Sequence, residues 1–390
     1  MGSKQLHMNY IGSKIRLAPF IISSMEEVTG GLKGSSFADL FAGTGAIARR
    51  VKAQVDRLIV NDWEDYANVL LKHYLNPEQT TADTELFDQL NALSPEKGFI
   101  YQAYCPSGEA GRKYFSDENG QKLDAICNYL QKARKNGLLK DGEFFHLSAS
   151  LLESADSVAN TASVYEAYLK KIKKTAQKPL FIKPAATEPG SPILEVYQED
   201  VSQLVKRIKG DVLYLDPPYN RRQYGSCYHM LNTIVNYQPF SPKGKTGLPP
   251  DYNKSAYCSL RKAGDAFRML IRNADFEYIF LSYNNEGILP LEEVRSVLAR
   301  YGKYDLATTD YQRYKADRAE NRTYTADKTQ EYLHILKRTE PVRIQFKGFQ
   351  SSPQKWPQKT SKQVLAQTTQ KSSLAAKPEQ KRLFEQKAVN

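Results

Sequence analysis

Short apolar runs alternate with longer amphipathic stretches over two separate parts of the chain. The runs at 57–62 and 276–287 have the length and β-branched composition of buried strands, and helical patterns follow them. The run 328–338 closes the pattern as a further strand. Because a strand followed by a helix returns the chain to the same edge of a sheet, this alternation predicts a doubly wound α/β fold.

A different pattern separates the two parts. From about residue 66 to residue 190 the apolar period is mostly helical, with one exception at 98–120, where alternating aromatics and a central Pro-Ser-Gly predict a hairpin. The proline- and glycine-bearing run 178–192 predicts a linker. We therefore expect a sheet domain made of 8–65 and 191–340, interrupted by a mostly helical insertion at 66–190.

Both ends of the chain depart from these patterns. Residues 349–390 lack a sustained period, are rich in Gln, Ser, Lys and Pro, and hold eight Lys or Arg against two Glu. This composition predicts a disordered basic tail that adds nonspecific attraction to nucleic acid. The first seven residues, MGSKQLH, precede a second methionine, Met8, and resemble a leader or a cloning remnant.

Composition narrows the class of protein. A hydrophobic content of 41% fits a globular chain, and no apolar run reaches membrane-spanning length, so we expect a soluble protein of the cytoplasm. A net charge of +12 favours a polyanionic partner. Neither the five histidines nor the cysteines have the close spacing of a metal site, so we expect no metal and isolated buried thiols. The cysteines are Cys105, Cys127, Cys227 and Cys258.

A glycine-rich turn follows the first predicted strand, in SSFADLFAGTGAIARRV. Its GTGAIA satisfies GxGxxA, which in a dinucleotide-binding protein brings Gly43 and Gly45 close to a pyrophosphate while Asp62 holds the ribose. Asp39 would repel those phosphates from the strand end. A carboxylate there suits a ligand with a positive amino group and no phosphate, such as S-adenosylmethionine. A structural turn with a capping Asp39 is the plain alternative.

The run YLDPPYNRRQY, 214–224, ends another predicted strand with an acid, two prolines and a tyrosine. An exocyclic base amine is a poor nucleophile because its lone pair is delocalised. Two acceptors aimed at its hydrogens, the Asp216 carboxylate and the Pro217 carbonyl, would free that lone pair, and Pro218 would fix their geometry. Tyr219 offers a stacking face for a base that has left the duplex. A proline-rich surface turn is the alternative.

The order of motifs NYIGSK, DLFAGTG, ND, a large insertion, ED and DPPY resembles the Dam-like, alpha-group adenine-N6 DNA methyltransferases. Within that group it is nearest to restriction–modification methylases of the FokI and NlaIII types, over residues 8–340. The resemblance implies a Rossmann-like S-adenosylmethionine-dependent sheet whose insertion recognises the target. It also implies methylation of a flipped-out adenine at N6 within a short site of double-stranded DNA, a possible cognate restriction endonuclease, and a nucleoid-associated location in the bacterial cytoplasm.

The resemblance also assigns residues. Asp62 matches the ribose-binding acid, and Asp200 matches the acid that receives the adenine amino group of the cofactor. By its residues alone, Asp200 is equally an N-cap of a helix at 201–208, while Tyr10 and Lys14 are equally loop packing and a solvated charge. The implied cofactor-binding residues are Tyr10, Lys14, Asp39, Phe41, Gly43, Gly45, Asp62 and Asp200. The implied catalytic residues are Asp216, Pro217, Pro218 and Tyr219.

Two basic and aromatic groups are candidates for DNA contact. One lies in the predicted hairpin of the insertion and the other directly follows the catalytic run. They consist of Arg112, Lys113, Tyr114, Arg221, Arg222 and Tyr224. A solvated hairpin with core tyrosines is the alternative for the first group. For the whole protein, an RNA or cytosine-N4 amino methyltransferase and a catalytically silent DNA-binding protein of the same fold stay open.

Overall fold

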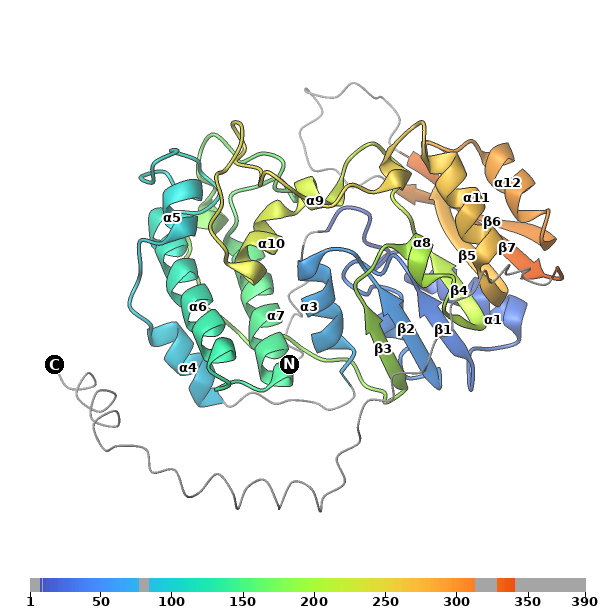
Figure 1. The fold of residues 1–390 in the computed structure, drawn as a ribbon, viewed down its shortest axis with the longest axis horizontal. Helices are drawn as coiled ribbons and strands as arrows, with labels where there is room; N and C mark the ends of the chain where they lie inside the picture. Colours follow the sequence, from blue (N-terminus) through green and yellow to red (C-terminus); the bar gives the residue numbers. More distant parts are fainter. Residues whose placement is uncertain (1–7, 9, 77–83, 313–327, 341–390) are drawn as a thin grey trace, which may run out of the picture. The chain divides into compact units, whose positions relative to one another are not determined.

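The computed structural model describes residue 8 and residues 10–76, 84–312 and 328–340. Within these ranges seven strands form one sheet of order β3-β2-β1-β4-β5-β7-β6 (Figure 1). Strands β1 to β5 pair in parallel, whereas β7 runs antiparallel to both β5 and β6. The strands are β1 (Ser36–Asp39), β2 (Arg57–Asn61), β3 (Ile193–Tyr197), β4 (Lys209–Leu215), β5 (Asp275–Asn284), β6 (Gly302–Gln312) and β7 (Lys328–Arg338). The predicted doubly wound fold is confirmed, and β6 is a strand that the apolar pattern does not reveal.

Helices cover both faces of this sheet, because successive side chains along a strand point to opposite faces and both sets are apolar. In β4, Val212 and Tyr214 pack with the helices of one face, and Leu213 and Leu215 pack with those of the other. The first face carries α1 (Ala18–Thr29), α2 (Ala48–Val51) and α3 (Asp65–Tyr74). The second face carries α8 (Val201–Leu204), α11 (Ala263–Asn273) and α12 (Leu291–Leu298).

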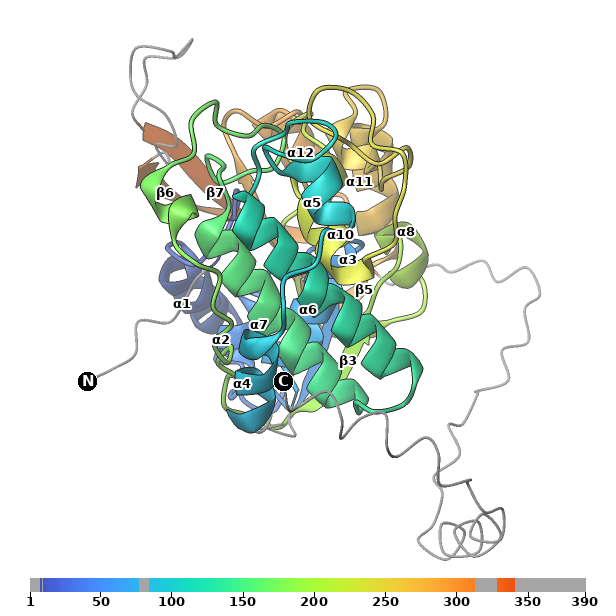
Figure 2. The same ribbon diagram turned by 90° about the vertical axis from the view of Figure 1, so that its left-hand side faces the viewer.

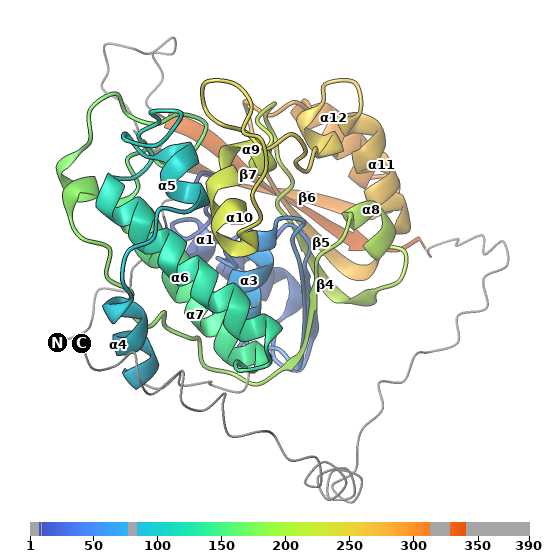
Figure 3. The same cartoon turned by 60° about the vertical axis from the view of Figure 1, so that its left-hand side comes forward.

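The segment between β2 and β3 is mainly helical, as its period predicts. The helices after α3 pack into a second apolar core together with α3 and α10, so the insertion shares buried surface with a helix that covers the sheet (Figures 2 and 3). This core holds α4 (Thr84–Ala92), α5 (Phe99–Tyr104), α6 (Asp117–Lys135) and α7 (Asp141–Val158) from the segment between β2 and β3, and α9 (Tyr224–Cys227) and α10 (His229–Asn236) from the chain after β4. Single 3-10 turns lie at η1 (Lys174–Gln177) and η2 (Ala256–Cys258). All of these elements belong to one compact unit.

The predicted hairpin at 98–120 is wrong, because residues 99–104 form helix α5 and the last residues of the stretch begin α6. The Asp124 carboxylate of α6 accepts hydrogen bonds from the backbone N–H groups of Gly98, Ile100 and Tyr101, at 3.1, 2.8 and 2.8 Å. These donors are the free N–H groups at the start of α5, so a residue of another helix supplies its N-terminal cap. A local alternation of aromatics cannot reveal such a cap.

The cysteines, the helices and the ends of the chain can also be compared with the sequence predictions. All four cysteines are buried and unpaired, as predicted. No helix within the described ranges is long and apolar enough to cross a bilayer. The predicted tail at 349–390 and the first seven residues lie outside the described residues.

The strand order reverses between β1 and β4, because the chain continues from β1 to β2 on one side and from β4 to β5 on the other. In open α/β sheets a ligand crevice forms outside the carboxyl ends of the strands at such a switch point. Asp39 is the last residue of β1, and Asp216 directly follows β4. The fold thus brings the glycine turn and the DPPY run to one edge of the sheet.

Candidate active site

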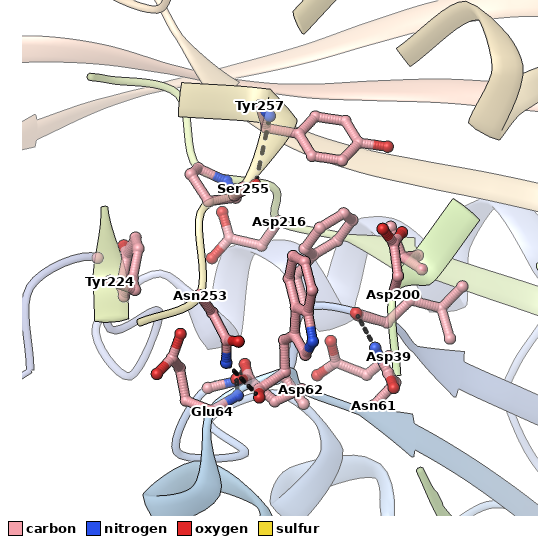
Figure 4. A pocket seen from close by; sticks show the side chains of 18 of the residues that line it. Asp39, Asn61, Asp62, Glu64, Asp200, Asp216, Tyr224, Asn253, Ser255 and Tyr257 are labelled. Carbon is pink, nitrogen blue, oxygen red and sulfur yellow. Dashed lines mark hydrogen bonds between the residues drawn. The ribbon is translucent and has the colours of Figure 1, made fainter. Parts of the chain in front are cut away.

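A cavity of about 500 Å³ opens at this edge of the sheet (Figure 4). Its volume suits a small-molecule ligand. Its walls come from the loop before α1, the glycine turn, the ends of β2 and β4, the start of α8, and the segment that leads into α11. Ten of the sequence-assigned residues line it: Tyr10, Lys14, Asp39, Phe41, Gly43, Asp62, Asp200, Asp216, Pro218 and Tyr224.

The glycine turn is shaped by backbone conformations that favour glycine. Gly43 and Gly45 have φ of 53° and 75°, in the left-handed region. A Cβ on Gly43 would stand 3.0 Å from the Tyr10 ring, so a side chain would crowd the wall of the cavity. Gly45 is not part of that wall. Its N–H closes the turn on the Ala42 carbonyl at 2.7 Å.

Asp39 is a buried acid with an unused acceptor. Its side chain is 1% exposed, and Oδ1 has no hydrogen-bond partner among the described residues. Burial raises the pKa of Asp39 well above its usual range, and the nearby carboxylates of Asp216 and Asp62 raise it further. A buried carboxylate in this setting needs a cationic partner, because isolated charge is costly to bury. The carboxylate acceptors of this corner therefore fit a ligand that carries an amino group.

Two further acids of the cavity wall are already engaged with the backbone. Asp62 accepts hydrogen bonds from the N–H groups of Gly43 and Glu64, at 2.8 and 3.0 Å, which ties the end of β2 to the glycine turn. Burial outweighs these bonds and raises the pKa of Asp62. Asp200 accepts from the Ser202 N–H at 2.8 Å and so caps α8, which confirms the N-cap interpretation. Both acids still line the cavity.

The DPPY acid pairs with a lysine of the N-terminal motif. Lys14 Nζ lies 2.7 Å from Asp216 Oδ1, and the lysine side chain is 4% exposed. Lys14 is therefore not the solvated charge that its sequence position allows. Burial lowers the pKa of Lys14, but the Asp216 carboxylate acts together with Tyr219, Tyr214 and Glu331 to raise it, and the net pKa lies well above its usual value. Burial raises the pKa of Asp216, and the Lys14 ammonium opposes that rise.

Tyr219 and Pro217 flank the cavity without lining it. The Tyr219 ring packs edge-on against Tyr283 with centroids 5.8 Å apart, and the Lys14 ammonium lies 5.3 Å from its centre. The Tyr219 carbonyl accepts from the Ile288 N–H at 2.9 Å. Pro217 is buried. The corner after β4 is therefore held by contacts on several sides, as its double proline predicts.

A cluster of tyrosines fixes the loop that carries Lys14. Tyr10 stacks on Tyr228 with centroids 4.7 Å apart, and its hydroxyl lies 3.0 Å from that of Tyr66. The Ile11 N–H donates to the Tyr228 hydroxyl at 2.6 Å, and the Tyr224 hydroxyl donates to the Ile11 carbonyl at 3.3 Å. Tyr224, one of the residues predicted for DNA contact, thus packs against this loop.

The other candidates for DNA contact divide into two environments. Arg221 and Arg222 are exposed after the DPPY run, and Arg222 makes a long 3.9 Å ion pair with Glu166. Lys113 is half-buried and donates to the Lys170 carbonyl at 3.2 Å. Arg112 and Tyr114, by contrast, are buried and donate only to backbone carbonyls among the described residues. Their geometry gives them an internal role and not the direct DNA contact predicted for them, and the burial of Tyr114 agrees with the core tyrosines of the alternative interpretation.

The chain matches the family of D12 class N6 adenine-specific DNA methyltransferases over residues 10–297. The chain belongs to this family. The reaction of such a methyltransferase is the methylation of the N6 amine of adenine in DNA, and the resemblance of the motifs is thereby confirmed. The family match covers the glycine turn, the insertion and the DPPY corner alike.

Named relatives of this methyltransferase agree with that assignment. Type II methyltransferase M.NlaIII of Neisseria lactamica is 50% identical over 334 residues, which cover 85% of this chain and 100% of the relative. Type II methyltransferase M.CviAII of Paramecium bursaria Chlorella virus 1 is 34% identical over 312 residues, covering 79% and 93%. The chain is also 32% identical to type II methyltransferase M.FokI of Planomicrobium okeanokoites over 348 residues, covering 85% and 53%.

Solved structures add little to this comparison. Magnesium protoporphyrin IX methyltransferase from Synechocystis PCC 6803 with bound SAM aligns over 83% of this chain and 80% of its own. Its TM-score is 0.30 at 8% identity, and a score this low carries no argument.

Sequence reasoning missed several residues of the methyltransferase cavity. Glu64 is 5% exposed and accepts from the Asn232 side-chain amide at 2.6 Å, and its burial raises its pKa to about 7. Asn253 donates to the Trp63 carbonyl at 2.9 Å and lines the cavity with Ser255 (Figure 4). Trp63 and Glu64 directly follow Asp62 in sequence, so their position next to a predicted site residue could have identified them. The segment around Asn253 carries no motif.

The methyltransferase site is built from acids, tyrosines and one buried lysine. Among the described residues, no cluster of three or more His, Cys, Asp or Glu is arranged to hold a metal ion. Lys14, Asp62 and Asp200 of the cavity engage other side chains or the backbone, whereas Asp39 keeps an unused oxygen.

Proposed function

We propose that this protein takes a methyl group from S-adenosylmethionine and places it on N6 of an adenine flipped out of duplex DNA at a short recognition sequence. It would serve as the modification half of a restriction–modification system in the bacterial cytoplasm, where it acts on the nucleoid beside a cognate endonuclease. The names of its type II methyltransferase relatives support this role. The observation that carries it is that Asp39 and Asp216, from neighbouring strands, both line one cavity.

The residues of the cavity suit the proposed cofactor. S-adenosylmethionine supplies an electrophilic methyl group on a sulfonium. Asp39 offers its unused oxygen to the amino group, and Asp62, already fixed by two backbone N–H groups, presents its remaining acceptor positions to the ribose. Asp200 would receive the adenine amino group from the start of α8. Gly43 keeps the wall of the cavity open, because a side chain there would meet Tyr10.

The corner after β4 would activate the adenine. Lys14 pairs with Oδ1 of Asp216 and favours its charged form, so Oδ2 would be the acceptor for one hydrogen of the N6 amine. The Pro217 carbonyl would accept a hydrogen bond from the second hydrogen of the amine. The lone pair of the nitrogen is then free to attack the methyl group as the bond from that methyl group to sulfur breaks. Tyr219, fixed against Tyr283, stacks on the base. Catalysis comes from positioning and electrostatics, without a covalent enzyme intermediate.

Recognition of DNA would come from two regions. Arg221 and Arg222 are exposed directly after the catalytic corner and suit contact with phosphates beside the flipped base. The insertion, residues 66–190, would serve as the target-recognition domain. Its readout of bases depends on side-chain geometry in the groove of bound DNA.

A transfer assay tests the proposal. The purified protein is incubated with labelled S-adenosylmethionine and mixed-sequence duplex DNA, and the DNA is digested to nucleosides for mass spectrometry. We expect N6-methyladenine at one short sequence, and none from an Asp216→Ala variant that still binds the cofactor. Label in N4-methylcytosine, or in RNA alone, would overturn the proposed substrate.

A further inference from the structure

The segment that follows α10 carries a tight turn, KGKTG at 243–247, which is fastened to the insertion through its backbone. Arg112 donates to the Gly244 carbonyl at 3.0 Å and to the Lys245 carbonyl at 3.1 Å. The Tyr114 hydroxyl donates to the Thr246 carbonyl at 3.0 Å, and the Tyr104 hydroxyl to the Gly247 carbonyl at 2.7 Å. Four consecutive carbonyls thus accept hydrogen bonds from buried side chains of the insertion.

Glycine is required at position 247 of this turn, because there is no room for a side chain there. Gly244 and Gly247 have φ of 68° and 76°, and Lys243 pairs with Leu248 across the turn. A Cβ on Gly247 would stand 2.8 Å from the Tyr104 ring and 2.9 Å from the Arg112 guanidinium. A Cβ on Gly244 would meet nothing within 4 Å. The backbone of Gly247 therefore lies directly against its anchor, and that of Gly244 does not.

The anchoring leaves positive charge at the surface. With its carbonyls turned toward the insertion, the turn exposes Lys243 and Lys245 to solvent. Arg112 beneath them is 8% exposed and pairs with no carboxylate among the described residues, so its charge is not neutralised. Lys113, next to it, donates to the carbonyl of Lys170, whose own side chain is exposed. A buried cation held by carbonyls and by the face of the Tyr104 ring, without a carboxylate partner, is costly, and here its hydrogen bonds hold a surface turn in one position.

The same segment reaches the cavity at its other end. After the turn the chain runs back across the molecule toward α11 (Figures 1 and 3). Ser255 and Gln223 exchange hydrogen bonds of 2.7 and 3.3 Å, and both line the cavity. Asn253 fastens the segment to the end of β2 through the Trp63 carbonyl. One continuous segment thus joins the lysine turn to the cavity wall.

We propose that the turn at 243–247 is a phosphate-contacting element for the DNA substrate, with Lys243 and Lys245 as the contacts and Arg112 as the positioning residue. This inference rests on the proposed function, because it takes duplex DNA as the ligand. It changes the role predicted for Arg112 from touching DNA to holding the turn that touches it. Phosphate contacts fix the register of a protein on DNA, which calls for a turn of defined position.

The first test removes the charges. We would measure the affinity of K243A/K245A for duplex DNA from 0.05 to 0.2 M salt, with K33A/K209A as the control. Lys33 and Lys209 are exposed residues that precede β1 and begin β4, at the opposite edge of the sheet. We expect affinity to fall about tenfold for the test variant and the salt slope to drop by about two, with cofactor affinity unchanged. The control should match the unmodified protein in DNA affinity, in salt slope and in cofactor affinity.

The second test moves the turn without changing its charge. Both G247A and G244A strain a left-handed backbone, but only G247A pushes the turn away from Arg112 and Tyr104. We expect G247A to lose several-fold in DNA affinity and to lower the salt slope, while G244A stays close to the unmodified protein. In the K243A/K245A background, G247A should bring no further loss, because the contacts that it displaces are already absent.

The outcomes separate this inference from the proposed function. If the unmodified protein methylates DNA while K243A/K245A keeps its affinity and salt slope, the turn does not contact DNA and the inference fails alone. In that case a protein partner would be the remaining candidate for the turn. If the unmodified protein neither binds nor methylates DNA, the proposed function itself fails.

Discussion

Lys14 Nζ and Asp216 Oδ1 lie 2.7 Å apart, and the lysine is almost fully buried. One residue belongs to the loop before α1 and the other follows β4, so the ion pair joins two motifs that are far apart in sequence. The pair gives the DPPY acid a fixed position, and the ammonium opposes the rise in the acid's pKa that burial causes. It also makes the acid sensitive to any change in the lysine.

Replacing the lysine should shift the pH dependence of methyl transfer. In Lys14→Met the pKa of Asp216 loses the opposing effect of the ammonium and rises further. Since the ionised acid is the acceptor, activity should then require a higher pH, with a rate at pH 7 lower by about tenfold or more. Single-turnover rates from pH 6 to 9 would measure this. Lys14→Arg keeps the charge and should retain most of the original profile; an unshifted profile in Lys14→Met would contradict the argument.

Removing the acid should abolish transfer and leave the cofactor site intact. Asp216→Ala deletes the acceptor, so we expect a rate at least about a hundredfold lower, with cofactor affinity by calorimetry nearly unchanged. The variant should also lose about 3 kcal/mol of unfolding free energy, because Lys14 stays buried without its partner. Adding Lys14→Met should restore part of that stability without restoring activity. Near-normal turnover in Asp216→Ala would remove the acceptor role.

Asp39 should affect stability and cofactor binding in opposite directions. Its pKa is raised by burial and by two neighbouring carboxylates, so Asp39→Asn removes an unfavourable charge and should raise the melting temperature of the free protein. The same change removes the negative charge that would pair with the amino group of the cofactor. Calorimetry should then show affinity lower by about tenfold, as expected for a lost charged hydrogen bond. Unchanged affinity would refute the placement of the cofactor.

Glu64 should make the free protein less stable as pH rises. Its folded-state pKa is about 7 against an ordinary value of 4.5, so its contribution is fully present below about pH 4.5 and is lost as pH rises through 7. Across that window the loss is about 1.4 kcal/mol per pH unit at most. Glu64→Gln, which can still accept from Asn232, should flatten the dependence and melt higher than the unmodified protein at pH 8. Thermal melts from pH 5 to 8.5 would decide it, and parallel curves would count against this role.

The glycine turn and the DPPY corner of the site could be predicted from the sequence, because the residues of each are neighbours within one short motif. Asp39 with its glycines and Asp216 with its prolines each sit where a strand ends, and a parallel sheet brings such ends to one edge. The cavity wall from the segment around Asn253 could not be anticipated. That segment reaches the cavity only through the contacts of Asn253 and Ser255 with residues distant in sequence.

The sequence by itself determined the period of each segment, the order of the motifs and the chemistry of their side chains, because these depend on neighbours along the chain. Only the tertiary structure decided that Asp124 caps α5, that Lys14 pairs with Asp216, and that Arg112 is held inside by carbonyls 133 residues away at Lys245. Each is a contact between elements that are distant in sequence. It forms because a buried charge or N–H group without a partner would be costly. The same basic and aromatic residues that suggest a DNA contact in sequence therefore become an internal anchor once they are packed.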